Sequence, residues 1–245
     1  MLKRMICTAM TLLMFSASAM AMPPCEDEIY QGMDVSVWQR SIDWTKVRAA
    51  GVQVAYIRAS EGSRVEDAYF RQHYEGAKAQ GIRVGFYHYM TARNVTEAEN
   101  QAEFFARVIR GTRPDCRLAL DYEATGDMTS EEINACALAF LKRLEEVTGW
   151  EACIYADAWA AREIFSKEEQ LASYPLWIAD WGVQTPQDTP LWRCWAGWQY
   201  TDNGRIPGVG GRVDLDRFNQ GIFLKRDSSL SPAPTPCPTI PLPEC

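Results

Sequence analysis

Short apolar segments typical of β-strands alternate with segments of helical period along most of the chain. Eight segments have strand character, at residues 33–38, 52–60, 84–90, 117–123, 152–156, 176–181, 195–201 and 213–218. Helices are predicted at 41–50, 67–80, 98–109 and 130–148, and the helical pattern fades after about Phe165. Repeated strand–helix–strand units imply a parallel sheet. Eight strands favour a closed α/β barrel over the alternative, a doubly wound open sheet.

The two ends of the chain depart from this pattern. Residues 1–21 combine Lys3 and Arg4, an apolar run and the sequence Ala19-x-Ala21, which predicts a signal peptide cleaved after Ala21. An uncleaved anchor is the alternative, but the apolar run is short for a membrane span. Six prolines among the last nineteen residues predict an extended Pro/Cys-rich tail at 227–245. Residues 22–226 remain for the barrel.

The net charge limits the kinds of molecule that the protein can bind. The formal net charge of −7 falls to −9 when Lys3 and Arg4 leave, which argues against a nucleic-acid groove or an anionic membrane surface as the binding partner.

The cysteines indicate an exported protein. Of eight cysteines, Cys7 leaves with the signal, and the other seven allow up to three disulfides in an oxidising compartment. Cys237 and Cys245 are close enough in sequence to close a small loop. With no Cys-x-x-Cys spacing and two histidines, we expect no metal or other cofactor.

Acidic residues stand near the ends of three predicted strands. Alternation along a strand places Asp121 and Glu123 on one face, where mutual repulsion raises one pKa and yields a neutral acid able to protonate a leaving oxygen. Asp34 and Asp214 interrupt apolar patterns in the first and last strands, which a closed barrel makes neighbours. Each acid alone also fits a solvated strand end or a cap. Together they predict a carboxylate site.

Aromatic residues gather near the same strand ends. They are Tyr87, His88, Tyr89, Tyr155, Trp177, Trp181, Trp195, Trp198 and Tyr200. Sugar rings present apolar C–H faces, so aromatic walls with a few polar groups suit a saccharide cleft. Core packing is the alternative for any one of these side chains. For His88, a hydrogen-bonded structural role is favoured over that of a base.

Seven short motifs occur in order along the chain: GMDVS at 32–36, ASEG at 59–62, GFYHY at 85–89, LDYE at 120–123, LWIA at 176–179, WQYT at 198–201 and VDLD at 213–216. In order and spacing, residues 31–223 resemble glycoside hydrolase family 25, the lysozymes of the Chalaropsis type. The resemblance implies an irregular (β/α) barrel with fewer than eight outer helices. It also implies hydrolysis of the β-1,4 bond between N-acetylmuramic acid and N-acetylglucosamine in peptidoglycan, with retention of configuration.

The resemblance assigns roles residue by residue. Glu123 would protonate the glycosidic oxygen, and Asp121 would hold the substrate's 2-acetamido group, which attacks the anomeric carbon in place of an enzyme nucleophile. Asp34 and Asp214 would line the floor, and Asp216 is the rival of Asp214 because it lies on the same strand face. Sugar contacts are expected from Arg58, Tyr87, Tyr155, Trp177 and Gln199.

Two other functions use the same features. A hydrolase of chitin-like N-acetylglucosamine polymers would share the acid and acetamido chemistry, and a catalytically silent barrel would only bind glycans. The intact set of four acids argues against the silent barrel. We expect an exported monomer, periplasmic or secreted, that contacts peptidoglycan glycan strands and, after signal cleavage, neither membrane nor nucleic acid.

Overall fold

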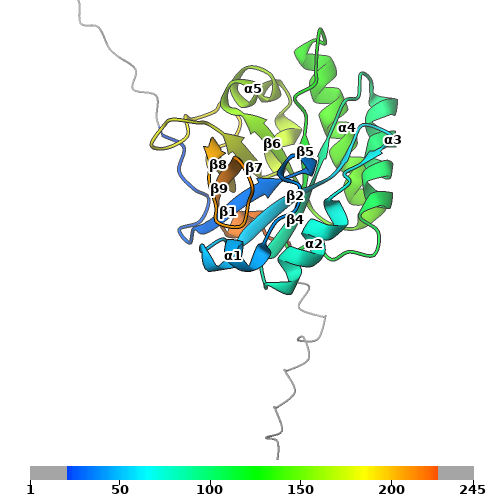
Figure 1. The fold of residues 1–245 in the computed structure, drawn as a ribbon. Helices are drawn as coiled ribbons and strands as arrows, with labels where there is room; N and C mark the ends of the chain where they lie inside the picture. The colour runs from blue at the N-terminus through cyan, green and yellow to red at the C-terminus, as the bar shows by residue number, and fades with distance from the viewer. Residues whose placement is uncertain (1–20, 226–245) are drawn as a thin grey trace, which may run out of the picture.

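In a computed structural model, which describes residues 21–225, eight strands close into a barrel (Figure 1). These strands are β1 (Tyr30–Val35), β2 (Val54–Glu61), β4 (Arg83–Tyr89), β5 (Leu118–Asp121), β6 (Ala152–Asp157), β7 (Leu176–Ala179), β8 (Gly197–Gly204) and β9 (Val213–Phe218). Around the ring they run β1-β9-β8-β7-β6-β5-β4-β2, and β2 pairs with β1 to close it; the short β3 (Val65–Glu66) pairs only with β2. The predicted α/β barrel is therefore confirmed.

One strand runs against the others. Strands β1, β2 and β4 to β8 are parallel, whereas β9 is antiparallel to both of its neighbours. The expectation of a purely parallel sheet is wrong at this point. The reason is the short connection at 205–212, since antiparallel strands can be joined by a turn while a parallel crossover needs a dozen or more residues.

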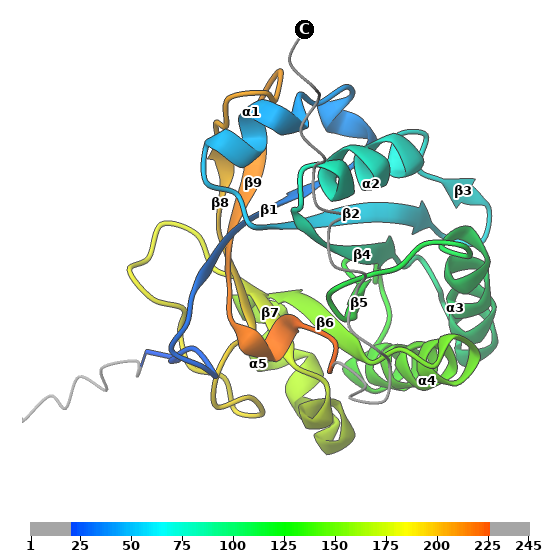
Figure 2. The ribbon, with the colours of Figure 1, turned by 90° about the horizontal axis from the view of Figure 1, so that it is seen from below.

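Five α-helices are present among residues 21–225, fewer than eight, as expected. They are α1 (Trp44–Ala49), α2 (Phe70–Ala79), α3 (Val95–Val108), α4 (Ser130–Thr148) and α5 (Ala158–Glu163). They lie outside the barrel, and a long loop at 180–196, yellow in Figure 2, takes the place of a helix between β7 and β8. Thr129 caps α4 in a capping box with Glu132, one residue before Ser130, the cap that the sequence suggests. None of the helices in this part of the chain has the length and apolar character needed to cross a membrane.

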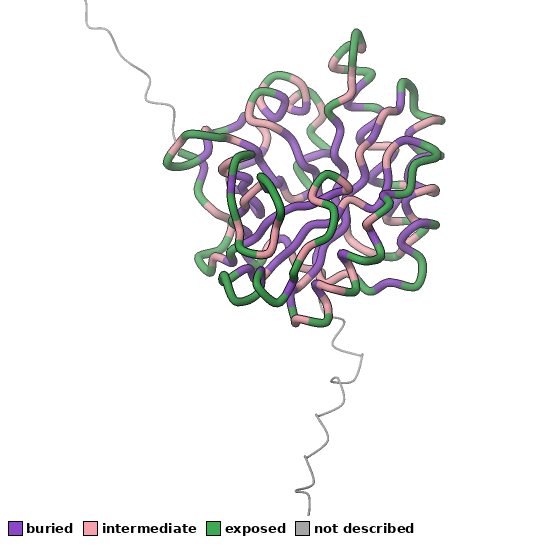
Figure 3. Tube along the Cα trace, viewed as in Figure 1, coloured by how far each residue is buried: buried purple, intermediate pink, exposed green. Residues whose placement is uncertain are grey.

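Apolar side chains fill the space between helices and strands, while exposed residues follow the outer loops and helix surfaces (Figure 3). A second cluster fills the barrel itself. There the Trp177 ring lies 4.6 Å from that of Tyr56 and 5.6 Å from that of Phe218, centroid to centroid. Gly85 is required beside Tyr56, because a Cβ at that position would lie 2.4 Å from the ring. These rings close the barrel interior, so a ligand can enter only at a mouth.

The first described residues are fastened to the loop before β8. Met22 is buried and its N–H donates to the Pro186 carbonyl at 2.8 Å, and a disulfide joins Cys25 to Cys194. Within the described residues, three further cysteines are buried and unpaired: Cys116, Cys136 and Cys153. Apart from Ala21, the expected signal peptide, the 227–245 tail and the Cys237–Cys245 loop lie outside the described residues.

Candidate active site

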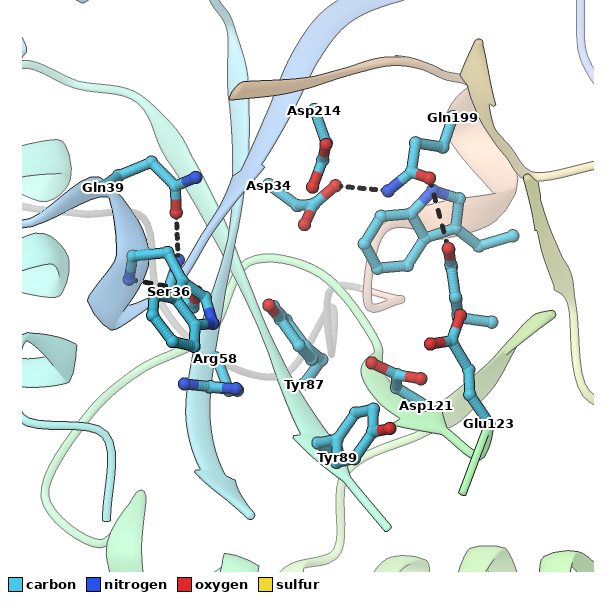
Figure 4. A pocket seen from close by; sticks show the side chains of 13 residues that line it. Asp34, Ser36, Gln39, Arg58, Tyr87, Tyr89, Asp121, Glu123, Gln199 and Asp214 are labelled. Carbon is cyan, nitrogen blue, oxygen red and sulfur yellow. Dashed lines mark hydrogen bonds between the residues drawn. The ribbon is translucent and has the colours of Figure 1, made fainter. Parts of the chain in front are cut away.

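A pocket of about 220 Å³ lies at the mouth where the carboxyl ends of the parallel strands meet (Figure 4). All nine site residues expected from the sequence line it: Asp34, Arg58, Tyr87, Asp121, Glu123, Tyr155, Trp177, Gln199 and Asp214. Tyr89, one of the aromatic residues that the sequence places near a strand end, also lines it, as do three residues that sequence reasoning did not select: Ser36, Trp38 and Gln39. A signal for these three was available, because Ser36 belongs to the GMDVS motif, and Trp38 and Gln39 follow it after one residue.

Asp121 and Glu123 reach the pocket from the end of β5. Asp121 is the last residue of the strand and is buried, whereas Glu123 lies two residues beyond it on the rim. Tyr122 between them turns the other way, and its hydroxyl donates to the Ala92 carbonyl at 2.6 Å. The two carboxyl groups therefore share one side of the chain, although Glu123 is outside the strand that the sequence predicts for it.

The surroundings of this pair hold both carboxyls toward the protonated form. Burial raises the pKa of Asp121 well above its usual range, and the charge of Glu123 raises it further. Asp121 Oδ1 is buried and has no hydrogen-bond partner in the protein. Glu123 is exposed at the rim, yet the pocket walls remove enough water from its carboxyl to raise its pKa. The charge of Asp157 adds to that rise, and the Tyr155 hydroxyl opposes it.

Asp34 and Asp214 face each other across the pair formed by the first and last strands, β1 and β9. They are partners in the register of β1 and β9, and because β9 runs antiparallel, its first residues lie at the mouth. Asp34 is buried, and its pKa is raised by burial first and by the charge of Asp214 second. Burial raises the pKa of Asp214 to about 6, and the charge of Asp202 contributes.

Gln199 is held in one orientation by three side chains. Its Nε2 donates to Asp34 Oδ2 at 2.8 Å, while its Oε1 accepts from the Tyr155 hydroxyl and from Trp181 Nε1, both at 3.1 Å. The amide can satisfy all three bonds in only one orientation. Gln199 therefore links the Asp34 end of the pocket to the aromatic wall on β6 and β7.

Asp216 lies deeper than Asp214 and does not line the pocket. It has no exposed surface, and its Oδ1 accepts from Trp177 Nε1 at 2.9 Å. Burial and the charge of Asp34 raise its pKa well above the usual range. The structure thus places Asp214, and not Asp216, in the pocket with the other acids.

The buried carboxylate of Asp67 lies outside the pocket and holds Arg58, which lines one side of it. Asp67 Oδ2 accepts from Arg58 Nε at 2.9 Å and from the Val37 backbone N–H at 2.8 Å. Arg58 Nη1 also donates to Glu61 at 3.3 Å. Asp67 was not selected from the sequence, because nothing in its local pattern shows that two pocket walls meet on it. It connects the guanidinium to the turn that carries Trp38.

Not every aromatic residue near a strand end belongs to the site. Trp195 and Trp198 are buried in the core between barrel and loops, and neither lines the pocket. His88 is fully buried, with Ser60 Oγ at 2.8 Å and Gln101 Oε1 at 3.2 Å from its ring nitrogens. Burial lowers its pKa to about 4, so it stays neutral, in agreement with a structural role. No group of three or more potential metal ligands occurs among residues 21–225.

Comparison with known proteins agrees with this geometry. The model of glycosyl hydrolases family 25 matches residues 33–209. The chain is 34% identical to lysozyme M1 of Streptomyces globisporus over 206 residues, 80% of this chain and 70% of that protein. It is 34% identical to the autolytic lysozyme of Clostridium acetobutylicum over 194 residues, 79% of this chain but only 57% of the relative's length.

A solved structure shows the same fold. The bacterial lysozyme from Streptomyces coelicolor superposes with a TM-score of 0.67 at 32% identity, covering 79% of this chain and 94% of that one. The family model spans more than half of the chain, and all the residues that line the pocket except Asp214 lie within the matched region. The chain therefore belongs to glycosyl hydrolase family 25.

Proposed function

We propose that this protein is an exported lysozyme, a muramidase that hydrolyses the β-1,4 bond between N-acetylmuramic acid and N-acetylglucosamine in peptidoglycan. Relatives named lysozymes support the substrate class. A neutral-to-acidic pocket with aromatic walls suits an uncharged sugar backbone better than a polyanion. The Cys25–Cys194 disulfide suits the oxidising compartment that the expected signal peptide implies.

The observation that carries the proposal is the unpartnered Oδ1 of Asp121 beside Glu123. A buried acceptor without a donor is costly, so a ligand that supplies an N–H gains a strong hydrogen bond there. The 2-acetamido group of a bound sugar has such an N–H. Glu123, whose pKa is raised, lies two residues away on the same side of the chain, where it can protonate the oxygen of the bond to be cut.

The reaction then needs no enzyme nucleophile. Glu123 gives its proton to the glycosidic oxygen, and the bond from that oxygen to the anomeric carbon breaks. The acetamido carbonyl oxygen of the same sugar attacks the anomeric carbon and forms a cyclic oxazolinium. The positive charge of this ring favours the ionised form of Asp121, which stabilises the ring in turn. Glu123 next removes a proton from water, which opens the ring at the anomeric carbon. Two inversions leave the original configuration.

The other lining residues support these two carboxyls. We assign Asp34 and Asp214 to the floor, where Asp214 raises the pKa of Asp34 and Asp34 raises that of Asp121, so that the cluster holds protons, and where a negative charge on the cluster favours a cationic transition state. Gln199 and Tyr155 hold the floor in place through the hydrogen bonds described above. Arg58, Tyr87 and Trp177 complete the walls against which the sugar rests. We propose that the protein acts as a monomer on peptidoglycan glycan strands.

Substitutions that keep the side-chain shape but remove the ionisable carboxyl test the roles of the two acids. Glu123→Gln and Asp121→Asn should each lower wall-clearing activity by about 10²–10⁴-fold, because each removes one half of the acid–acetamido chemistry. On an aryl glycoside whose leaving group needs no proton, Glu123→Gln should recover much of its rate and Asp121→Asn should not. Steady-state rates on both substrates, with circular dichroism to verify folding, provide the measurement.

Two outcomes would contradict the scheme at different levels. A covalent glycosyl-enzyme trapped on Asp121 by a fluorosugar, together with turnover of substrates lacking the acetamido group, would exclude substrate assistance but leave the muramidase proposal standing. Mass analysis of wall digests decides the substrate. Reducing N-acetylmuramic acid ends support the proposal, whereas digestion of chitin alone, or binding of glycans without cleavage, would replace it with one of the two alternatives.

A further inference from the structure

Among the described residues, the three most exposed tryptophans each follow the carboxyl end of a parallel strand. Trp38 is 79% exposed, Trp159 64% and Trp181 50%, whereas the other six tryptophans are buried or half-buried. Trp38 follows β1, Trp159 follows β6 and Trp181 follows β7. An exposed indole is a flat apolar face of the kind that packs against sugar rings. Their shared location at the mouth therefore extends the site beyond the pocket.

Trp38 and Trp159 occupy opposite sides of the mouth. Trp38 lies in the short 3₁₀ turn η1 (Val37–Gln39), directly after β1, and Trp159 lies in the first turn of α5, directly after β6. In the closed ring, three strands separate β1 from β6 in either direction. The carboxylate pocket lies between them. A linear glycan that crosses the pocket along this line meets one indole on each side.

Glu123 marks the boundary between the two sides. It lines the main pocket, and it also lines a second hollow of about 70 Å³ that Trp159, Asp157 and Thr125 border. The remaining walls of that hollow are mostly apolar and come from Tyr122 after β5, from β6 and α5, and from the residues after α5. Asp121 lines the main pocket and not the hollow. The hollow is thus on the far side of Glu123 from Asp121.

The direction of the glycan follows from this order and rests on the proposed function. The sugar whose acetamido group meets Asp121 lies in the main pocket, and Glu123 touches the oxygen that leaves. The sugar carrying that oxygen must then lie beyond Glu123. We infer that Trp159 is the stacking platform for the leaving N-acetylglucosamine, so that the reducing-end part of the strand lies over α5 and the non-reducing part lies toward Trp38.

The same platform would hold an acceptor sugar. Transfer of the glycosyl group to a sugar hydroxyl is the reverse of the cleavage step, so an acceptor occupies the place of the leaving sugar. Its hydroxyl proton passes to Glu123 as its oxygen bonds to the anomeric carbon, and the bond from that carbon to the acetamido oxygen breaks, which opens the oxazolinium ring. Trp159 therefore sets the ratio of glycosyl transfer to hydrolysis as well as the affinity for the leaving side.

Two substrates with the same N-acetylglucosaminyl-N-acetylmuramyl glycone test this assignment. One is the tetrasaccharide, whose leaving group is a disaccharide, and the other is the disaccharide fluoride, whose leaving group is too small to reach Trp159. Trp159→Ala should lower kcat/KM on the tetrasaccharide about tenfold and leave the fluoride within about twofold, since stacking is lost only for the first. Trp159→Phe should retain most of the tetrasaccharide activity. Trp38→Ala, on the opposite side, should affect both substrates alike.

The transfer reaction provides a second test of the assignment of Trp159. With the fluoride as donor and free N-acetylglucosamine as acceptor, Trp159→Ala should reduce the ratio of transfer product to hydrolysis product about tenfold. Equal losses of Trp159→Ala on both substrates, no loss on either, or an unchanged transfer ratio would overturn the assignment. If the wild-type protein cleaves neither substrate, the proposed function itself fails, and that result is distinct from any failure of Trp159.

Discussion

At the scale of single residues, the acids of the pocket differ in what surrounds them. Asp214 and Asp216 lie two residues apart on one strand face, so their sequence positions make them equivalent. The fold separates them, since Asp214 lines the pocket whereas Asp216 is fully buried against Trp177 Nε1. Only a carboxyl that reaches the pocket can act on the substrate.

This difference predicts opposite outcomes for two matched substitutions. Asp214→Asn should lower kcat by about tenfold or more, because it removes a negative charge that faces the reacting sugar. Asp216→Asn should retain most of the wild-type kcat, because Asn Oδ1 can still accept from Trp177 Nε1. Steady-state kinetics of both variants on peptidoglycan makes the comparison. Equal losses in both variants would remove the distinction drawn from the pocket.

At the scale of elements, β9 and the loop at 180–196 shape the site most. The reversal of β9 brings the first residues of that strand, and not the last, to the mouth. Asp214 reaches the pocket for this reason. The loop at 180–196 carries Trp181 against Gln199, and the Cys25–Cys194 disulfide holds the chain just before β8 to the start of the described chain.

The disulfide should therefore contribute measurably to the free energy of unfolding. It spans a sequence separation of 169 residues, and cross-links over loops of this size typically contribute about 2–5 kcal/mol. Cys25→Ser combined with Cys194→Ser should lower the free energy of unfolding in urea by that order. Dithiothreitol should destabilise the wild type in the same way and leave the double variant unchanged. A reductant effect of equal size in the double variant would mean that another bond is responsible.

At the scale of the whole molecule, the acid cluster couples folding to pH. Burial raises the pKa values of Asp34, Asp121 and Asp216 well above the usual range, so the folded protein holds protons that the unfolded chain has released. A raised carboxyl pKa gives stability that is fully present below about pH 4 and is lost as pH rises through the folded-state pKa. The buried histidine His88 has the opposite sign, since its pKa is lowered to about 4.

Comparing two proteins isolates the carboxyl contribution. Asp216→Asn removes one raised pKa and leaves the histidines in place, so the variant should become progressively more stable than the wild type as pH rises from 5 to 8. The gain is at most about 1.4 kcal/mol per pH unit, or roughly 3–5 °C in Tm. Thermal unfolding at each pH provides the measurement. A Tm difference that stays constant or shrinks with rising pH would show that Asp216 is ionised in the folded protein.

The sequence by itself determined the barrel and the mouth at which the expected acids meet. Strand and helix periods are local properties, and each parallel strand followed by a helix directs its carboxyl end to one mouth. Residues placed at those ends, such as Asp121 and Tyr155, had to converge there whatever the details of packing. A closed barrel makes the first and last strands neighbours, and this alone placed Asp34 beside the last strand. These inferences needed connectivity and period, not side-chain positions.

The tertiary structure decided what depends on distance and water. The direction of β9 follows from a short connection rather than from the strand's own residues, and it selects Asp214 over Asp216. Trp195 and Trp198 have the same local pattern as cleft aromatics, yet they are buried, while Trp38 and Trp159 are exposed. Asp67 binds Arg58 and the Val37 N–H only because distant segments meet. Burial, which fixes the pKa of each acid, is a property of the assembled barrel that no single segment carries.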